Sequence, residues 1–147
     1  MKTNFLKIFL VLLLAIYAQI SYAQCGKNLV FESSKTEYLD ADGKVTRSQD
    51  KPVDLNVADS VLTVQFGDNQ DQVLTGKITG ATCTGKTPFK DGIMVLKAVL
   101  KNPAGIQQTA TLTFISTKGN TTLLYTCQER AALRIQLSAD KFEEVKP

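Results

Sequence analysis

Hydrophobic and polar residues alternate along most of the chain after residue 23, with the period of a β-strand. Between residues 107 and 116, Ala110, Leu112 and Phe114 fall on one face and threonines fall on the other. Period-two alternation bounded by turn residues is the pattern of half-buried strands. Applied along the chain, it predicts about eight or nine strands, at 28–39, 53–58, 61–66, 73–79, 93–101, 107–116, 122–127, 132–137 and 141–145.

Turn residues and glycines add detail to these strands. Asp59-Ser60 lies between two alternating runs and predicts a hairpin. Gly76, inside its strand, predicts a bulge or a bend. Residues 80–92 are rich in Gly and Thr and predict a loop. The run at 93–101 is apolar on both faces apart from two lysines, which is typical of a central strand covered on both sides.

The order of these elements predicts an all-β fold. No helix of three turns is expected after residue 23, and sequential strands with short connections favour an antiparallel meander. In a chain of this length such a meander usually forms a closed or nearly closed small barrel, with a β-sandwich as the alternative. Closure would also remove the exposed strand edges that promote aggregation.

The first residues have the composition of a signal peptide. Lys2 and Lys7 are followed by an apolar run that is too short for a comfortable membrane span of about 20 residues. Ser21-Tyr22-Ala23 supplies small residues where a signal peptidase cleaves. We expect residues 1–23 to be a signal peptide and residues 24–147 to be a single secreted or periplasmic domain, with no integral membrane segment.

The charge of the chain gives no reason to expect a nucleic-acid partner. The full sequence carries a formal net charge of +3, and removal of Lys2 and Lys7 with the signal peptide leaves +1. The remaining basic residues do not form a run that would neutralise a series of phosphates.

Three cysteines, Cys25, Cys83 and Cys127, remain in the expected mature chain. An oxidising compartment favours a disulfide, and the odd number leaves one cysteine over. A bond between Cys83 and Cys127 would stabilise folding by roughly 4 kcal/mol in the chain-entropy model, but Cys25 could equally be a partner. In the alternative, Cys25 carries a lipid anchor, although Gln24 stands where such signals have Gly, Ala or Ser.

One segment matches the P-loop pattern G-x-x-x-x-G-K-[ST], through Gly80, Gly85, Lys86 and Thr87. In a true P-loop the backbone amides hold phosphates and a helix begins at the Lys and Thr. Here Pro88 follows at once and a strand is expected soon after, so no helix fits. We interpret the match as chance and predict no nucleotide site.

The composition also argues against catalysis. The sequence has no histidine, which excludes the Ser-His-Asp triad, the Cys-His pair and the usual zinc ligands. Most acidic residues lie in expected turns or near the C-terminus, where local structure explains them. We therefore predict that the protein is not an enzyme and uses no cofactor or metal.

By strand count, length and expected export, the chain resembles the small secreted lipocalin-like proteins of bacterial envelopes. That family carries Gly-x-Trp on its first strand, where this chain has Asn28-Leu29-Val30. The resemblance implies a barrel that binds a small apolar ligand inside. The side chains that would line such a site are those of Met94, Leu96, Leu112, Phe114 and Tyr125.

Two other functional classes remain open. A structural or interaction module of the cell envelope, with an unknown protein partner, would have a solid core and an exposed apolar patch. A membrane-embedded barrel would need an apolar outer band, which Lys97, Lys101 and the outward threonines of residues 107–116 contradict.

Overall fold

The computed structural model describes residues 25, 28–87 and 89–146, so the expected signal peptide lies outside the described residues. Its strands form one antiparallel sheet of eleven, in the order β11-β1-β4-β5-β6-β7-β8-β9-β10-β2-β3. The strands are β1 (Leu29–Ser33), β2 (Thr36–Leu39), β3 (Val45–Gln49), β4 (Val53–Ala58), β5 (Val61–Phe66), β6 (Val73–Thr87), β7 (Asp91–Lys101), β8 (Gln107–Thr117), β9 (Asn120–Cys127), β10 (Arg130–Ser138) and β11 (Lys141–Glu144).

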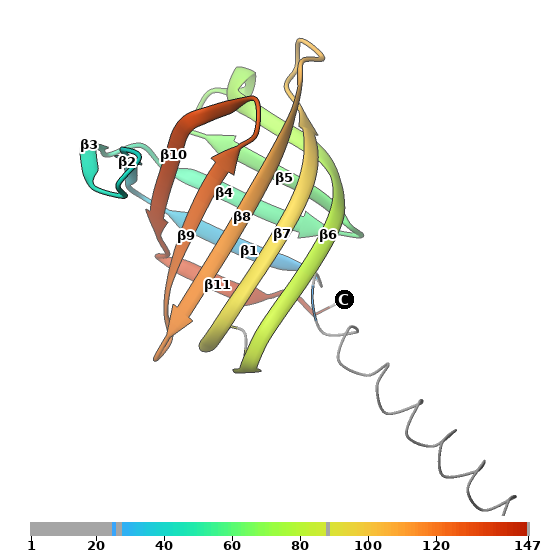
Figure 1. Cartoon of the computed structure of the whole chain (residues 1–147). Coiled ribbons are helices and arrows are strands. Elements are labelled where there is room, and N and C mark those ends of the chain that lie inside the picture. The colour runs from blue at the N-terminus through green and yellow to red at the C-terminus, as the bar shows by residue number, and fades with distance from the viewer. Residues whose placement is uncertain (1–24, 26–27, 88, 147) are drawn as a thin grey trace, which may run out of the picture.

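The all-β prediction and the antiparallel meander are confirmed. From β4 to β10 every strand pairs with the next along the chain. The only helical element among the described residues is a 3₁₀ turn, η2 (Gln70–Gln72). Figure 1 shows the sheet curling strongly, so that β1 and β4 pass behind β7, β8 and β9. All the described strands belong to one sheet, whereas a sandwich would place them in two.

The two ends of the strand order, β11 and β3, lie beside β1 and β2, and these two strands follow each other directly along the chain. β1 and β2 are separated only by Ser34 and Lys35, yet β1 pairs with β11 and β2 pairs with β10. The register is continuous across this break, because Glu32 opposes Lys141 and Glu37 opposes Gln136. The Asp140 amide donates to the Glu32 carbonyl at 2.8 Å, and the Ser34 amide donates to Asp140 Oδ2 at 2.6 Å.

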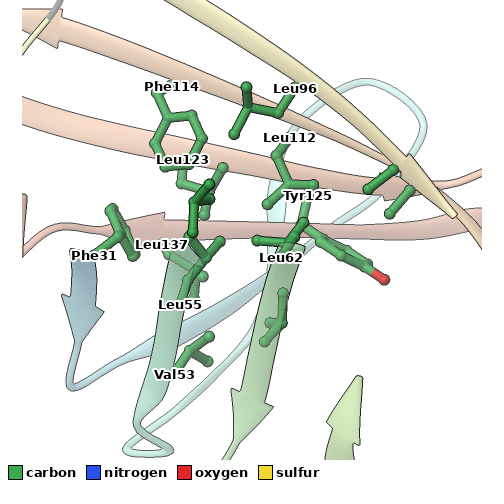
Figure 2. Close-up of a cluster of buried hydrophobic side chains, with 14 of the residues drawn as sticks. Phe31, Val53, Leu55, Leu62, Leu96, Leu112, Phe114, Leu123, Tyr125 and Leu137 are labelled. Carbon is green, nitrogen blue, oxygen red and sulfur yellow. The ribbon is translucent and has the colours of Figure 1, made fainter. Parts of the chain in front are cut away.

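The core lies on the concave face of the curled sheet. Alternate residues of β4, β5, β7, β8 and β9 point inward and are buried, as the period-two pattern predicts. Figure 2 shows side chains from several strands meeting in this core. Burial of one such large apolar side chain contributes about 1.5–3 kcal/mol. The largest fully buried side chains include Phe31, Leu55, Leu62, Met94, Leu96, Leu112, Phe114, Leu123 and Leu137.

The loop expected at 80–92 is wrong over most of its length. β6 continues through Thr87, and Gly80 to Thr84 pair with Ile93 to Lys97 of β7. The long apolar strand β7 provides a partner for this segment, so ladder hydrogen bonds offset the low strand propensity of its glycines, while its threonines favour a strand. The sequence predicts a bulge or a bend at Gly76. The register shift in this part of β6 lies two residues later, between Ile78 and Gly80.

Two further strand predictions need correction. β7 is covered on one face only, because Met94 and Leu96 are buried while Ile93 is 43% exposed. A one-sided antiparallel sheet leaves the other face in solvent even where that face is apolar.

β3 was not predicted at all. All five of its residues are exposed, so no apolar alternation marks it.

The disulfide joins Cys25 to Cys83, with Cα atoms 5.7 Å apart, and Cys127 is a buried free thiol. The Cys83–Cys127 pairing considered from the sequence is therefore wrong. Cys83 lies on β6 and Cys127 on β9, with β7 and β8 between them in the sheet. Three interstrand spacings of about 4.8 Å exceed the Cα separation of about 7 Å that a disulfide can bridge.

Candidate functional site

A cleft of about 350 Å³ opens at one end of the curled sheet. Side chains from six strands and from the connections between them converge on it. They are Tyr38, Lys51, Phe66, Asp71, Gln72, Leu74, Asn102, Gln108, Tyr125, Arg130, Leu133 and Ile135. We call this site the mouth cleft.

The meander explains why these residues meet. In an up-and-down sheet every second connection lies at the same end. The connections at 67–72, 102–106 and 128–129, which follow β5, β7 and β9, therefore gather at the mouth. The segment 50–52 joins them, because the Gly67 amide donates to the Pro52 carbonyl at 2.7 Å. The mouth cleft is thus a product of topology, with wall residues at strand ends.

The deeper walls of the mouth cleft are apolar and aromatic. Phe66 packs edge-on against Tyr125, with ring centroids 5.7 Å apart. Leu74 and Leu133 are half-buried and pack against the core, and Ile135 is buried. A concave, mostly apolar surface with a few placed polar groups is the usual form of a small-molecule site.

Tyr125 is part of the core, and its hydroxyl begins a series of side-chain hydrogen bonds beside the cleft. Its ring is buried, and Figure 2 shows its hydroxyl pointing away from the other labelled side chains. Gln108 Nε2 donates to this hydroxyl at 2.7 Å, while Gln108 Oε1 lies 3.7 Å from the Sγ atom of Cys127. The single proton of that thiol is directed to the closer acceptor, Glu129 Oε2 at 3.3 Å. The NH₂ group of Gln108 faces Tyr125.

The electrostatic surroundings keep Tyr125 and Cys127 protonated. Burial, reinforced by the charges of Cys127 and Glu129, raises the pKa of Tyr125 far above its usual value. Burial, followed by the hydrogen bond to Glu129, raises the pKa of Cys127. The pKa of Glu129 is lowered, first by the hydrogen bond from the Thr109 amide, so this carboxylate stays charged. Tyr125 is therefore a neutral hydroxyl donor at physiological pH.

Charged groups lie at the rim of the mouth cleft. Lys51 Nζ donates to Gln72 Oε1, and Gln72 follows Asp71 on η2. Arg130 begins β10, which pairs with β9, the strand that carries Tyr125. Arg47 lies outside this lining, with its guanidinium 4.0 Å from the centroid of the Tyr38 ring.

The opposite end of the sheet is filled by phenylalanines. Phe142 of β11 stacks on Phe114 at 5.0 Å between ring centroids, and it also contacts Phe31 at 6.0 Å and Phe89 at 4.8 Å. The connections there are tied together, since the Gly119 amide donates to the Lys90 carbonyl. The mouth cleft and this aromatic cluster thus occupy opposite ends of the molecule.

The structure places the five predicted ligand-lining residues in two different settings. All of them are buried in the core cluster. Tyr125 alone also lines the mouth cleft, whereas Met94, Leu96, Leu112 and Phe114 pack against other core side chains and do not line it.

The other lining residues were missed by the sequence prediction. Most of them lie at strand ends or in connections, and inward alternation identifies the middle of a strand rather than its end. The available signal was topological: in the predicted meander, the aromatic and charged residues beside every second turn should share one end.

The P-loop-like segment has no P-loop conformation. Its residues belong to β6 up to Thr87, and β7 begins at Asp91. A helix that would present its N-terminus to phosphates does not follow Lys86. The described residues also contain no group of three or more His, Cys, Asp or Glu side chains that could hold a metal ion.

Within the described part of the chain, no helix has the length and hydrophobicity needed to cross a membrane. A scan against protein-family models finds no matching family, and a search of curated proteins finds no similar sequence.

Proposed function

We propose that the protein is an exported, non-catalytic β-barrel domain that holds a small, largely apolar ligand in the mouth cleft. The observation that carries this proposal is the cleft itself. Its volume of about 350 Å³ falls within the range of about 300–1,000 Å³ typical of small-molecule sites. Phe66, Leu74, Tyr125, Leu133 and Ile135 give it apolar and aromatic walls.

The pairing at the ends of the strand order supports a closed barrel like that of the lipocalin-like proteins. Joining β1 with β2, β3 with β4 and β10 with β11 across their short breaks would reduce the eleven strands to eight, each with two neighbours. A barrel of eight strands has room inside for its own side chains or one small ligand. An interior filled by its own side chains, with a cleft at one end, is consistent with a barrel of eight strands.

Hydrogen exchange tests the closure. In a closed barrel the amides that pair β1 with β11 and β2 with β10 would exchange as slowly as those pairing β7 with β8, because none would lie at an open edge. Rapid exchange confined to β1, β2, β10 and β11 would contradict it.

The Cys25–Cys83 disulfide supports export, because such bonds persist in oxidising compartments. It also argues against the alternative of a lipid anchor. A sulfur that forms a disulfide cannot at the same time form the thioether to a lipid. The intact mass of protein purified from its own host would distinguish a chain starting near Gln24 from a lipidated one.

A second candidate function is an interaction module of the cell envelope. Ile93 and Ile115 are direct cross-strand partners on the outer face, and they are 43% and 45% exposed. Such a pair would suit a protein contact, although it is much smaller than a typical interface.

The two functions can be separated with a neutral fluorescent probe, N-phenyl-1-naphthylamine, and two matched substitutions. Leu133→Glu puts a charge into the cleft wall, and Ile115→Glu puts the same charge on the outer face. We expect wild type and I115E to bind the probe alike and L133E to bind it at least about tenfold more weakly, because a charge buried by the ligand is costly.

Native mass spectrometry of protein from its own host provides the second readout, since a co-purifying small mass is expected. Failure of the wild-type protein to bind the probe, together with no co-purifying mass, would overturn the binding proposal. Loss of a protein complex in I115E alone would favour the interaction module.

A further inference from the structure

The mouth cleft has polar groups at its rim and apolar side chains below them. From this arrangement, and resting on the proposed function, the geometry points to an amphiphile with a carboxylate head. The head would bind between the Tyr125 hydroxyl and the Arg130 guanidinium, with the apolar tail against the deeper wall. This inference names the ligand class that the proposed site takes.

The first argument is the direction of the hydrogen bonds. Gln108 Nε2 donates to the Tyr125 hydroxyl, so the oxygen accepts that bond and its own proton remains to be donated. The Gln108 Oε1 atom is directed at the Cys127 Sγ atom, 3.7 Å away, rather than at the hydroxyl. Among the described residues no acceptor for the Tyr125 proton is present, and Tyr125 lines the cleft. The cleft therefore presents a hydroxyl donor to whatever binds there.

The second argument is charge. Among the charged residues that line the cleft, Lys51 and Arg130 are cationic and Asp71 is anionic. Asp71 lies on η2, where Lys51 approaches through Gln72. Arg130 and Tyr125 both line the cleft and come from β10 and β9, which pair with each other. A hydroxyl donor beside a guanidinium matches an anionic oxygen.

The carboxylate of Glu129 works against this match, because its charge acts on Tyr125 more strongly than that of Arg130. Both of its oxygens, however, accept the Thr109 amide, at 2.9 and 2.8 Å, and one accepts the Cys127 thiol. It faces these donors and does not line the cleft. The side chain of Arg130 has no hydrogen-bond or ion-pair partner among the described residues, so its guanidinium donors are available to a ligand.

The third argument is the apolar surface. Below the polar rim, Phe66, Leu74 and Ile135 face the cleft and continue into the core. A ligand that contacts both regions must have a polar end and an apolar end. The volume of about 350 Å³ suits one short or medium alkyl chain rather than a two-chain lipid.

The test is displacement of N-phenyl-1-naphthylamine by decanoate and by decanol, which share a tail length and differ in the head group. For Arg130→Gln we expect decanoate to bind about two- to fivefold more weakly, the range for a solvent-exposed ion pair, and decanol to change less than twofold. Arg130→Glu should weaken decanoate further. Rising salt should weaken decanoate but not decanol in the wild-type protein.

Two further variants complete the test. Lys97→Glu makes the same change of charge as R130E on the exposed outer side of β7, and it should leave decanoate binding unchanged. Tyr125→Phe removes the hydroxyl and should weaken decanoate while the neutral probe still binds. If R130Q, R130E and Y125F affect decanoate no more than decanol, the carboxylate inference is overturned and the binding function stands. If neither compound nor the probe binds the wild type, the proposed function itself fails.

Discussion

Gly76 is the position in β6 that can least accept a side chain. A Cβ atom added there would lie 1.8 Å from the Val99 carbonyl oxygen and 2.9 Å from the Leu100 Cα atom, both of them backbone. Because backbone of a central strand cannot move aside cheaply, Gly76→Ala should lower the free energy of unfolding by about 1–3 kcal/mol, as overpacking does. Urea unfolding measures the change.

Gly80, four residues further along the same strand, provides the matched control. A Cβ atom there meets only Lys97 Cβ at 3.9 Å, an ordinary contact. Gly80→Ala should therefore leave stability unchanged or raise it by up to about 1 kcal/mol, because alanine restricts the unfolded chain. Equal losses in the two variants would contradict the close approach at Gly76.

Cys127 is a buried thiol beside a carboxylate, and both features suppress its reactivity. Burial and the hydrogen bond to Glu129 raise its pKa, so the reactive thiolate is scarce even where an ordinary cysteine, with a pKa of about 8.5, is half ionised. We expect iodoacetamide to leave the native protein unmodified at about pH 8.5. The denatured, unreduced protein should take up one label, since the other two cysteines are bonded. Fast labelling of the native protein would contradict this.

At the scale of the elements, β11 is a short strand attached mainly by one side chain. It pairs four residues with β1, and Phe142 packs against three other phenylalanines. Phe142→Ala should lower the free energy of unfolding by about 2–4 kcal/mol, since it removes these ring contacts and leaves a gap. Chemical denaturation measures this loss.

Glu143 gives the control on the same strand. Among the described residues its carboxylate pairs only with the exposed Lys141, at 3.3 Å, so Glu143→Ala should change stability by less than about 0.5 kcal/mol. Because the aromatic cluster lies opposite the mouth cleft, folded F142A should still bind the neutral probe. Similar stabilities of the two variants would show that Phe142 does not hold β11.

Which elements could be predicted depended on whether one face of a strand is buried. Period-two alternation identified β8 from Ala110, Leu112 and Phe114, because those side chains face the core. It could not identify β3, whose residues are all exposed and are held by pairing with β2. It also ended β6 too early, since the glycines and threonines of its second half are placed by their partner β7 rather than by their own pattern.

At the scale of the whole molecule, the sequence located the core better than the site. The residues expected to line a cavity do point inward, but four of them fill the core, because alternation cannot tell a packed interior from a hollow one. The mouth cleft depends on which connections share an end of the sheet. That arrangement follows from pairing between segments as distant as Glu37 and Gln136, and no local pattern records it.

The disulfide is the one covalent link across the fold, and its contribution can be separated from that of the site. Cys25 and Cys83 are 58 residues apart, so the chain-entropy model gives a stabilisation of roughly 4 kcal/mol. The double variant Cys25→Ala, Cys83→Ala should lose about that much free energy of unfolding. Cys83 opposes Met94, which opposes Phe114 of the aromatic cluster, so the bond lies away from the mouth cleft. Probe affinity should therefore be unchanged wherever the variant remains folded. A loss below about 1 kcal/mol, or a peptide map linking Cys83 to Cys127, would contradict this pairing.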